Sequence, residues 1–530
     1  MPQLIQQYVS RQAIQCPNRR AVVCKNESIS YGELDQLTNQ LAHRLNASGC
    51  RCGDRVAVLI PQSANAIFAM LGILKADCLY VPIDPDGSAE QIAAILNAVK
   101  PKVLLAARSR TELLDDVFAE YDLPNDMLVG TLEAVPLKGD YFESSFTGLN
   151  VLGASKLQRP YECKPTDPAV IRFHSDDRRG VVLSHANMIY GIDWGLKYFQ
   201  WDVQDRIASD GPPHFDLATF NTIGTFAAGA ELHLVSSTLH SQPHKLAEFL
   251  RSREMTQWVT TTSSLSSFVE RDVVQNGDLP SLKRIIWTSK ESLLNSAIEQ
   301  LKQRLPLTQF TRIFGVPEAS SLCNYFTIPV RSMDESANIP IGRACDGVGL
   351  FVLDHELQPV ALDEIGELYI GGVGLSSGYW HDPDRTATNF VQHPILKQRL
   401  FKTGQSARIS SDGLAYLEGR AAIHDEFEER TLIDHSKDSM IGTIMLDLAV
   451  VQSRIAHLIA DKLELNEPAV DTDLFNEGIL DSLSYVRLVV ELQQEFGVQI
   501  SLGEIDIDHF RTVEQIAEFL MQHLGELATA

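Results

Sequence analysis

Short apolar runs alternate with helical patterns between residues 29 and 420, and this alternation constrains the fold more than any other feature of the chain. The run Arg55–Ile60 is mostly apolar, Ala64–Lys75 has a helical pattern, and Leu79–Pro82 is a second apolar run. A strand that is followed by a helix usually pairs in parallel with the next strand, because the helix carries the chain back across the sheet. The pattern therefore predicts an α/β fold with largely parallel sheets.

The chain is predicted to contain a large domain, a linker and a small helical domain. Residues 1–420 form the large domain, and its runs become shorter and rich in glycine after residue 339, as in Gly366–Gly372, which predicts a small β-rich subdomain. Residues 421–446 are dense in charge and lack strand alternation, so we interpret them as a linker. Residues 447–530 carry helical apolar stripes, which predict an all-α four-helix domain.

The composition is that of a globular protein with enough apolar surface for a sizeable core. Of the 530 residues, 44% are hydrophobic and 22% are charged, which is ordinary for such proteins. The net charge of −24 argues against nucleic acid as a partner. Residues 451–530 hold 15 acidic residues against 4 Lys and Arg, so we expect this segment to attract basic faces of partner proteins.

The sequence predicts a protein of the cytoplasm that has no membrane partner. The N-terminus lacks a basic segment followed by an apolar core, so no signal peptide is expected. No apolar run approaches the roughly 20 residues that a membrane helix needs. The eight cysteines are scattered, and Cys50-x-Cys52 has no second pair with which to complete a zinc site. We therefore expect ordinary reduced thiols.

Ser482 is the most informative single residue. It follows a loop that contains Gly478, and it begins an amphipathic run with helical spacing. The motif Asp481-Ser482-Leu483 resembles the attachment site of acyl and peptidyl carrier domains, where a transferase links 4′-phosphopantetheine to the serine. The resemblance implies that Ser482 anchors a thiol that holds a substrate as a thioester. The alternative is a plain helix N-cap, because Ser and Asp both favour that position.

Five segments of the large domain keep a common order along the chain: Ile29–Leu34, Leu74–Pro85, Gly180–His185, His214–Ala218 and Gly371–Trp380. Together they resemble an amino-acid adenylation domain of the adenylate-forming ligase superfamily, as found in nonribosomal peptide synthetases. Members activate a carboxylate with ATP as an acyl adenylate and then transfer it to a thiol. The resemblance implies the fold of that superfamily for residues 1–420.

By this resemblance, three residues belong to a vestigial substrate and nucleotide site. Asp216 stands where the amino-acid-activating branch has the aspartate that holds the substrate ammonium group, although a turn aspartate would look the same in the sequence. Glu318 corresponds to a magnesium ligand, and Arg420 to the arginine of a retained Gly-Arg pair. The implied cofactors are 4′-phosphopantetheine and, if the site is active, ATP with magnesium.

The residues that would bind ATP depart from the family pattern. The family's phosphate loop is rich in glycine, serine and threonine, whereas residues 174–180 are fewer and include two aspartates, which repel a polyphosphate. Pro317 stands where a hydroxyl would contact phosphate, and it has no polar side-chain atom. Gln405 stands where an aspartate would accept the ribose hydroxyls, and its neutral amide makes weaker hydrogen bonds. The hinge aspartate is replaced by Ala422.

The family's mobile C-terminal subdomain, which supplies a catalytic lysine, has no room between Arg420 and the first helix of the small domain. Loss of one preorganised contact of this kind lowers a rate by about 10²–10³. We therefore hypothesise an inactive adenylation-like scaffold fused to a carrier that is loaded in trans. The expected partners are a phosphopantetheinyl transferase, a trans-acting adenylation or acyl-loading enzyme, and downstream tailoring or condensing enzymes.

Two alternatives stay open. The chain is either a self-loading ligase that activates an amino acid and attaches it to its own carrier, or a sensor that binds an amino acid or nucleotide without turnover. The retained Asp216, Glu318 and Arg420 favour the ligase. The altered phosphate loop and the missing subdomain oppose it. A simple binding assay separates the sensor from the other two.

We expect one phosphopantetheine arm per chain, attached to Ser482. After incubation with CoA and a promiscuous phosphopantetheinyl transferase, intact-mass spectrometry should show the arm on the wild type and none on Ser482→Ala. Ser484→Ala is the matched control, because it removes a neighbouring hydroxyl, and it should be modified like the wild type. An unmodified wild type, or an arm on Ser482→Ala, would contradict the carrier interpretation.

Overall fold

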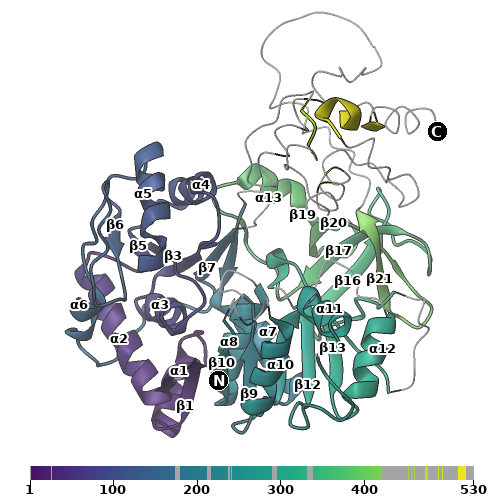
Figure 1. Cartoon of the computed structure of the whole chain (residues 1–530), viewed down its shortest axis with the longest axis horizontal. Coiled ribbons are helices and arrows are strands. Elements are labelled where there is room, and N and C mark those ends of the chain that lie inside the picture. Colours follow the sequence, from purple (N-terminus) through teal and green to yellow (C-terminus); the bar gives the residue numbers. More distant parts are fainter. Residues whose placement is uncertain are drawn as a thin grey trace, which may run out of the picture. The chain divides into compact units, whose positions relative to one another are not determined.

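The chain divides into two compact units, residues 1–424 and 425–530. A computed structural model describes the following residues: 2–25, 27–173, 179–211, 216–236, 239, 242–288, 295–320, 322–330, 338–420, and short stretches between 452 and 520. Figure 1 shows the helices and strands of the first unit. The predicted four-helix domain and linker lie mostly outside the described residues.

The first sheet of unit 1 has seven strands and is parallel except at one edge, where β7, β8 and β18 pair in antiparallel fashion. In sheet order the strands are β18 (Gly378–Tyr379), β8 (Gly180–Ser184), β7 (Pro168–Phe173), β4 (Leu79–Pro82), β3 (Arg55–Leu59), β5 (Val103–Ala106) and β6 (Leu128–Gly130). The two apolar runs that predicted strands are β3 and β4. Their parallel pairing confirms that part of the sequence prediction.

The second sheet has nine strands, and its six central strands run in parallel. In sheet order they are β15 (Arg343–Ala344), β14 (Asn324–Thr327), β13 (Gln309–Phe314), β12 (Arg284–Thr288), β11 (Gln257–Thr261), β9 (Arg206–Ser209), β10 (Glu231–Leu234), β1 (Arg20–Cys24) and β2 (Glu27–Ser30). The strands at both edges are antiparallel to their neighbours.

A third, antiparallel sheet confirms the predicted β-rich subdomain. It contains β16 (Val348–Leu353), β17 (Gly366–Gly372), β20 (Arg399–Ile409), β19 (Phe390–Gln392) and β21 (Ala415–Arg420). Strand β20 is the centre of this sheet, since it pairs with β17, β19 and β21.

Helices form layers between and outside the two large sheets (Figure 1). The inner layer contains α1 (Gln7–Gln15), α2 (Tyr31–Ala47), α3 (Ala64–Lys75), α7 (His185–Phe199) and α8 (Asp216–Ala228). Helices α4 (Ala89–Val99) and α5 (Thr111–Glu120) cover the outer face of the first sheet. The outer face of the second is covered by α10 (Pro243–Ser252), α11 (Thr262–Glu270) and α12 (Asn295–Arg304). Two short helices lie at the periphery, α6 (Gly148–Leu152) against α2 and α13 (Pro383–Asn389) beside β18 and β19.

Helix α3 contacts both large sheets, which explains its apolar sequence. It packs against β1 of the second sheet and against β3 and β4 of the first, and residues 66–75 are all buried. Ser63 caps its first turn by accepting a hydrogen bond from the Ala66 N–H. At Gly72, a Cβ atom would lie 2.6 Å from a methyl carbon of Leu41, so glycine allows α2 and α3 to approach closely.

Lys75, at the end of α3, is a buried cation of this inner layer, and it is paired. Lys75 is 1% exposed, and its Nζ lies 2.6 Å from Asp35 Oδ1 and 2.9 Å from Asn39 Oδ1. Asp35 also accepts a hydrogen bond of 2.7 Å from the Ser10 hydroxyl. These contacts join α1, α2 and α3, and they satisfy a cation whose burial would otherwise be costly.

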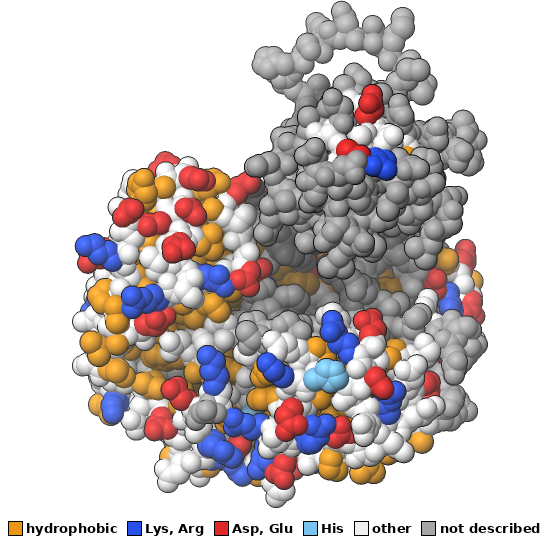
Figure 2. All heavy atoms as spheres, viewed as in Figure 1, with side chains coloured by type: hydrophobic (Ala, Val, Ile, Leu, Met, Phe, Trp, Pro, Cys, Tyr) orange, Lys and Arg blue, Asp and Glu red, His pale blue; other side chains and the backbone are white. Residues whose placement is uncertain are grey.

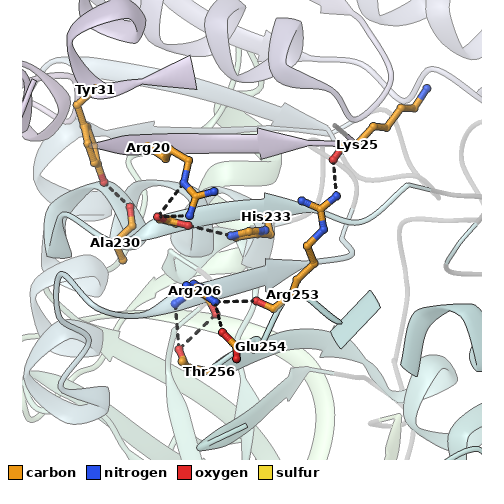
Figure 3. Close-up of polar contacts among 10 residues, drawn as sticks. Arg20, Lys25, Tyr31, Arg206, Ala230, His233, Arg253, Glu254 and Thr256 are labelled. Carbon is orange, nitrogen blue, oxygen red and sulfur yellow. Dashed lines mark hydrogen bonds and ion pairs between the residues drawn. The ribbon is translucent and has the colours of Figure 1, made fainter. Parts of the chain in front are cut away.

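Polar contacts also fasten the start of α2 and the strand β1 to β10 and to the residue before it (Figure 3). The Tyr31 hydroxyl donates a hydrogen bond of 2.6 Å to the carbonyl of Ala230. The carboxylate of Glu231 lies 3.1 Å from Arg20 Nη2 and 3.2 Å from His233 Nε2. Burial alone would raise the pKa of Glu231, but the hydrogen bond to His233 and the charge of Arg20 outweigh it and lower that pKa.

The visible face of unit 1 carries acidic and basic side chains close together (Figure 2). Arg206 and Glu254 form one such exposed pair, with 2.8 Å between their charged atoms. Surface pairs of this kind contribute little to stability, so we attribute the stability of unit 1 mainly to its buried layers. None of the helices within the described ranges is long and apolar enough to cross a membrane.

The free energy of unfolding of unit 1 should fall in acid because of His185. This residue begins α7, its Nδ1 accepts a hydrogen bond of 3.4 Å from the Ile5 N–H, and burial lowers its pKa to about 4. The unfolded chain takes up a proton near its ordinary pKa of about 6.5, whereas the folded chain does not until about pH 4. Stability contributed by neutral His185 is therefore present above about pH 6.5 and is lost towards pH 4, by at most about 1.4 kcal/mol per pH unit.

Urea denaturation between about pH 7 and about pH 5 checks this expectation. Tryptophan fluorescence reports on unit 1, because all five tryptophans lie within residues 1–424. His185→Gln should have a smaller pH slope than the wild type. His355→Gln, which changes an exposed histidine, should keep the wild-type slope. Equal slopes in the wild type and His185→Gln would disprove the assignment.

Candidate functional site

The structure places the candidate residues at the ends of strands and at the start of a helix. Glu318 lies in the 3₁₀ turn Pro317–Ala319, directly after β13. Asp216 begins α8, and Arg420 ends β21. Ser482 and residues 174–178 of the predicted phosphate loop lie outside the described residues.

Glu318 is buried, and its carboxylate is held by a tyrosine. It is 2% exposed, and its Oε1 accepts a hydrogen bond of 2.8 Å from the Tyr379 hydroxyl. Arg179 donates to the same hydroxyl at 3.3 Å, and its guanidinium lies 5.4 Å from the centre of the Tyr379 ring. Such hydrogen bonds to a charged acceptor are among the stronger ones in proteins. A carboxylate that resembles a magnesium ligand is thus engaged within the protein.

The backbone around Glu318 is joined to the segment that precedes Tyr379. The Ser376 N–H donates to the Glu318 carbonyl at 2.8 Å, and the Ser320 hydroxyl donates to the Gly374 carbonyl at 2.7 Å. A Cβ atom at Gly374 would lie 3.1 Å from the Ala319 carbonyl oxygen, so glycine permits this close approach. Both the segment around Glu318 and the segment Gly371–Trp380 carry the family resemblance in the sequence, but the contact of Tyr379 with Glu318 was not predicted from it.

Gln405 and Arg420 are direct partners across β20 and β21. The Gln405 N–H donates to the Thr403 hydroxyl at 3.2 Å, and that hydroxyl donates to the Leu368 carbonyl at 2.7 Å. The Gln405 Oε1 is buried and has no hydrogen-bond partner among the described residues. It can accept one hydroxyl of a ribose, whereas an aspartate would offer two charged oxygens. The fit to a nucleoside is therefore partial.

Arg172 is a buried cation that the sequence analysis overlooked. It lies in β7, is 3% exposed, and donates a hydrogen bond of 2.8 Å to the Thr219 hydroxyl of α8. Burial lowers the pKa of Arg172 to about 10. With Phe220 and Leu322 it lines a cavity of about 10 Å³, which is room for one water molecule. The sequence signal that could have revealed this buried cation is an arginine within an otherwise apolar strand.

Asp210 is a second overlooked residue, and it lies just after β9. It is 5% exposed, and its Oδ2 accepts hydrogen bonds from the Thr260 hydroxyl at 2.6 Å, the Ser264 hydroxyl at 3.2 Å and the Trp258 indole N–H at 3.3 Å. These donors are all neutral. Asp210 and Thr260 also line, with Asn221, a second cavity of about 10 Å³. The described space beside α8 is therefore nearly filled by side chains.

Residues 9–380 match the AMP-binding enzyme family. The chain belongs to this family. A second match, to the phosphopantetheine attachment site family, covers residues 453–520 and includes Ser482. The order of the two matches is the adenylation and carrier architecture of nonribosomal peptide synthetases, as the sequence resemblance implied. A phosphopantetheine cofactor and a phosphopantetheinyl transferase follow from the second match, and use of ATP is typical of the first.

Two of the curated relatives are named as synthases. Zwittermicin A synthase ZmaJ of Bacillus cereus is 28% identical over 430 residues, which cover 79% of this chain and 77% of ZmaJ. Gramicidin S synthase 2 of Brevibacillus brevis is 29% identical over 433 residues, again 79% of this chain but only 9% of the synthase. The chain therefore spans most of ZmaJ and a small part of the gramicidin enzyme.

Solved structures confirm the predicted fold class. The nonribosomal peptide synthetase FmoA3 has a TM-score of 0.70 at 23% identity, covering 97% of this chain and 50% of that chain. A putative long-chain-fatty-acid CoA ligase from Rhodopseudomonas palustris has a TM-score of 0.67 at 20% identity, covering 79% of this chain and 99% of that one. At these identities the likeness shows the fold alone, which is the adenylate-forming α/β fold.

Replacing Tyr379 should destabilise unit 1 through Glu318. In Tyr379→Phe the buried carboxylate loses one hydrogen bond, which costs about 1.5–3 kcal/mol for a charged acceptor. Urea denaturation followed by tryptophan fluorescence measures the change. Tyr416→Phe is the control, because the Tyr416 hydroxyl makes no hydrogen bond to another described residue, and its effect should stay below about 0.5 kcal/mol. Equal effects of the two variants would show that the Tyr379–Glu318 bond contributes nothing.

Proposed function

We propose that the chain is a carrier protein that is loaded in trans, and that its adenylation-like domain is a catalytically inactive scaffold. The carrier holds an acyl or aminoacyl group as a thioester on a phosphopantetheine arm at Ser482, within nonribosomal-peptide-type biosynthesis of a natural product. The observation that carries the proposal is an adenylate-forming fold that lacks the C-terminal subdomain and in which residue types needed for ATP have been replaced. Gln405 in place of an acidic residue is the clearest of these in the structure.

The surroundings of Glu318 support the loss of adenylation chemistry. A magnesium ion prefers hard oxygen ligands and retains several waters, so it needs an accessible carboxylate. Glu318 is 2% exposed and accepts the Tyr379 hydroxyl. The preceding residue is Pro317, which offers no hydroxyl to a phosphate. The turn Pro317–Ala319 therefore offers neither an accessible carboxylate to a magnesium ion nor a hydroxyl to a phosphate.

The charge of the second unit supports a carrier that meets other proteins. Residues 451–530 hold 15 acidic residues against 4 Lys and Arg. Loading and tailoring enzymes with basic faces would meet this segment faster, because opposite charges steer diffusional encounter. Tethering the carrier to a domain that binds such an enzyme would also raise the effective concentration of the thiol near it.

A self-loading ligase is the second candidate, and the observation that favours it is that the Gln405 Oε1 has no hydrogen-bond partner within the described part of the chain. Gln405 pairs with Arg420 in the backbone register of β20 and β21, and its amide oxygen is one neutral acceptor of the kind that a ribose hydroxyl needs. A nucleotide that binds there without turnover would correspond to the sensor function. The candidates differ in what ATP does, so assays with ATP separate them.

We expect no amino-acid-dependent exchange of pyrophosphate into ATP above the level of a Glu318→Ala control. Gln405→Asp should not restore exchange, because it changes neither the phosphate loop nor the missing subdomain. With the arm attached, ATP and a pool of amino acids alone should leave the intact mass unchanged, whereas a separate acyl-loading enzyme should add a thioester. Exchange that depends on one amino acid and disappears in Glu318→Ala would establish the self-loading ligase instead.

A further inference from the structure

Four of the eight cysteines gather in two pairs near the start of β3 and β4. Cys52 Sγ and Cys163 Sγ lie 3.4 Å apart, although 111 positions separate them in the sequence. Cys52 is exposed and Cys163 is half-buried. Cys50 and Cys78 form the second pair, and both are buried. From the sequence we expected ordinary reduced thiols, because the spacing of cysteines along a chain does not report such a contact.

Asp77 holds the two segments that carry Cys52 and Cys163. Its carboxylate accepts the Glu162 N–H at 3.1 Å and the Cys163 N–H at 3.4 Å. Its carbonyl accepts the Gly53 N–H at 2.9 Å. The neighbours of both sulfurs are thus hydrogen-bonded to a single residue, which fixes the contact between two otherwise irregular segments.

The pair is not arranged as a metal site. Among the described residues, no group of three or more His, Cys, Asp and Glu side chains is placed to hold a metal ion. Structural zinc sites need four ligands in a tetrahedron. The contact between Cys52 and Cys163 therefore points to chemistry between the two sulfurs.

We propose that Cys52 and Cys163 are a reversible redox pair that a low-molecular-weight disulfide converts into an internal disulfide. In the first step, the Cys52 thiolate attacks one sulfur of the small disulfide, which forms a mixed disulfide and releases one small thiol. In the second step, the Cys163 thiolate attacks Cys52 Sγ and releases the second small thiol. Two protein thiols are oxidised and the small disulfide is reduced to two thiols, which take up the protons of both cysteines.

Exposure and burial set the order of these steps. Cys52 is open to solvent, so it meets the small disulfide first. Burial raises the pKa of the Cys163 thiol, and its neighbour Cys52 and the nearby Asp77 carboxylate raise it further. A thiol of raised pKa forms little thiolate, so Cys163 does not attack the small disulfide first. Its Sγ lies 3.4 Å from Cys52 Sγ, so it is placed to resolve the mixed disulfide once that has formed. Cys50 and Cys78 are 0% and 2% exposed, which keeps them away from the reagent.

The disulfide would join the turn before β3 to the segment that leads into β7. The closed loop would contain β3, β4, β5 and β6, which are four of the seven strands of the first sheet. Closing a long loop restricts the unfolded chain and therefore favours the folded one. The oxidised protein should accordingly have a higher Tm than the reduced protein, and a thiol reductant should reverse the difference.

The experiment uses the full chain without its phosphopantetheine arm, so that the arm's thiol does not compete. The reduced protein is incubated with oxidised glutathione and analysed by intact-mass spectrometry and by peptide mapping without reductant. We expect the mass to fall by two hydrogen atoms and one cross-linked peptide pair to contain Cys52 and Cys163. Dithiothreitol should restore the reduced mass.

Three variants separate the pair from the other cysteines. Cys163→Ser should retain one glutathione on Cys52, and Cys52→Ser should gain neither a glutathione on Cys163 nor the internal disulfide. Cys24→Ser, which changes a half-buried cysteine elsewhere, should behave like the wild type. A wild-type map without the Cys52–Cys163 link, or with a different cysteine pair, would overturn the proposal whether or not the variants fold.

Discussion

The burial of α3 on all sides is the constraint on which unit 1 depends. The helix touches both large sheets, so it buries part of each against the other. A helix in this position must be apolar around its whole circumference. Its single cation, Lys75, is the last residue of the helix and must be paired there. Lys75 meets this requirement through Asp35 and Asn39 of α2. The same residues thereby fix how α2 and α3 lie against each other.

The candidate residues come from three separate places on this framework. Glu318 comes from the turn after β13 of the second sheet, Tyr379 from the edge of the first sheet, and Gln405 from the third sheet. The ring of Tyr379 belongs to the large core that holds the sheets together, whereas Glu318 and Gln405 do not. A change of residue type at Gln405 can therefore remove chemistry and leave the fold intact. This separation makes an inactive but stable domain physically reasonable.

The sequence predicted those parts of unit 1 that are determined by local pattern. β3, α3 and β4 were predicted because each is a run of apolar residues that packs on both sides, and their bounds agree with the structure within one residue. The contact between Glu318 and Tyr379 joins positions 61 apart, and the contact between Cys52 and Cys163 joins positions 111 apart. No periodicity records such contacts, because they depend on how whole strands are ordered in a sheet.

Asp77 combines two requirements that few side chains meet together. Its φ of 59° lies in the left-handed region, where glycine, asparagine and aspartate are the residues most easily accommodated. Its carboxylate also accepts hydrogen bonds from two backbone N–H groups. Glycine has no side-chain oxygen that could accept them. Asparagine keeps the backbone preference and one acceptor oxygen, whereas glutamate loses the backbone preference and alanine loses both. Position 77 should thus show a narrow spectrum of tolerated residues in a saturation library, with aspartate first and asparagine second.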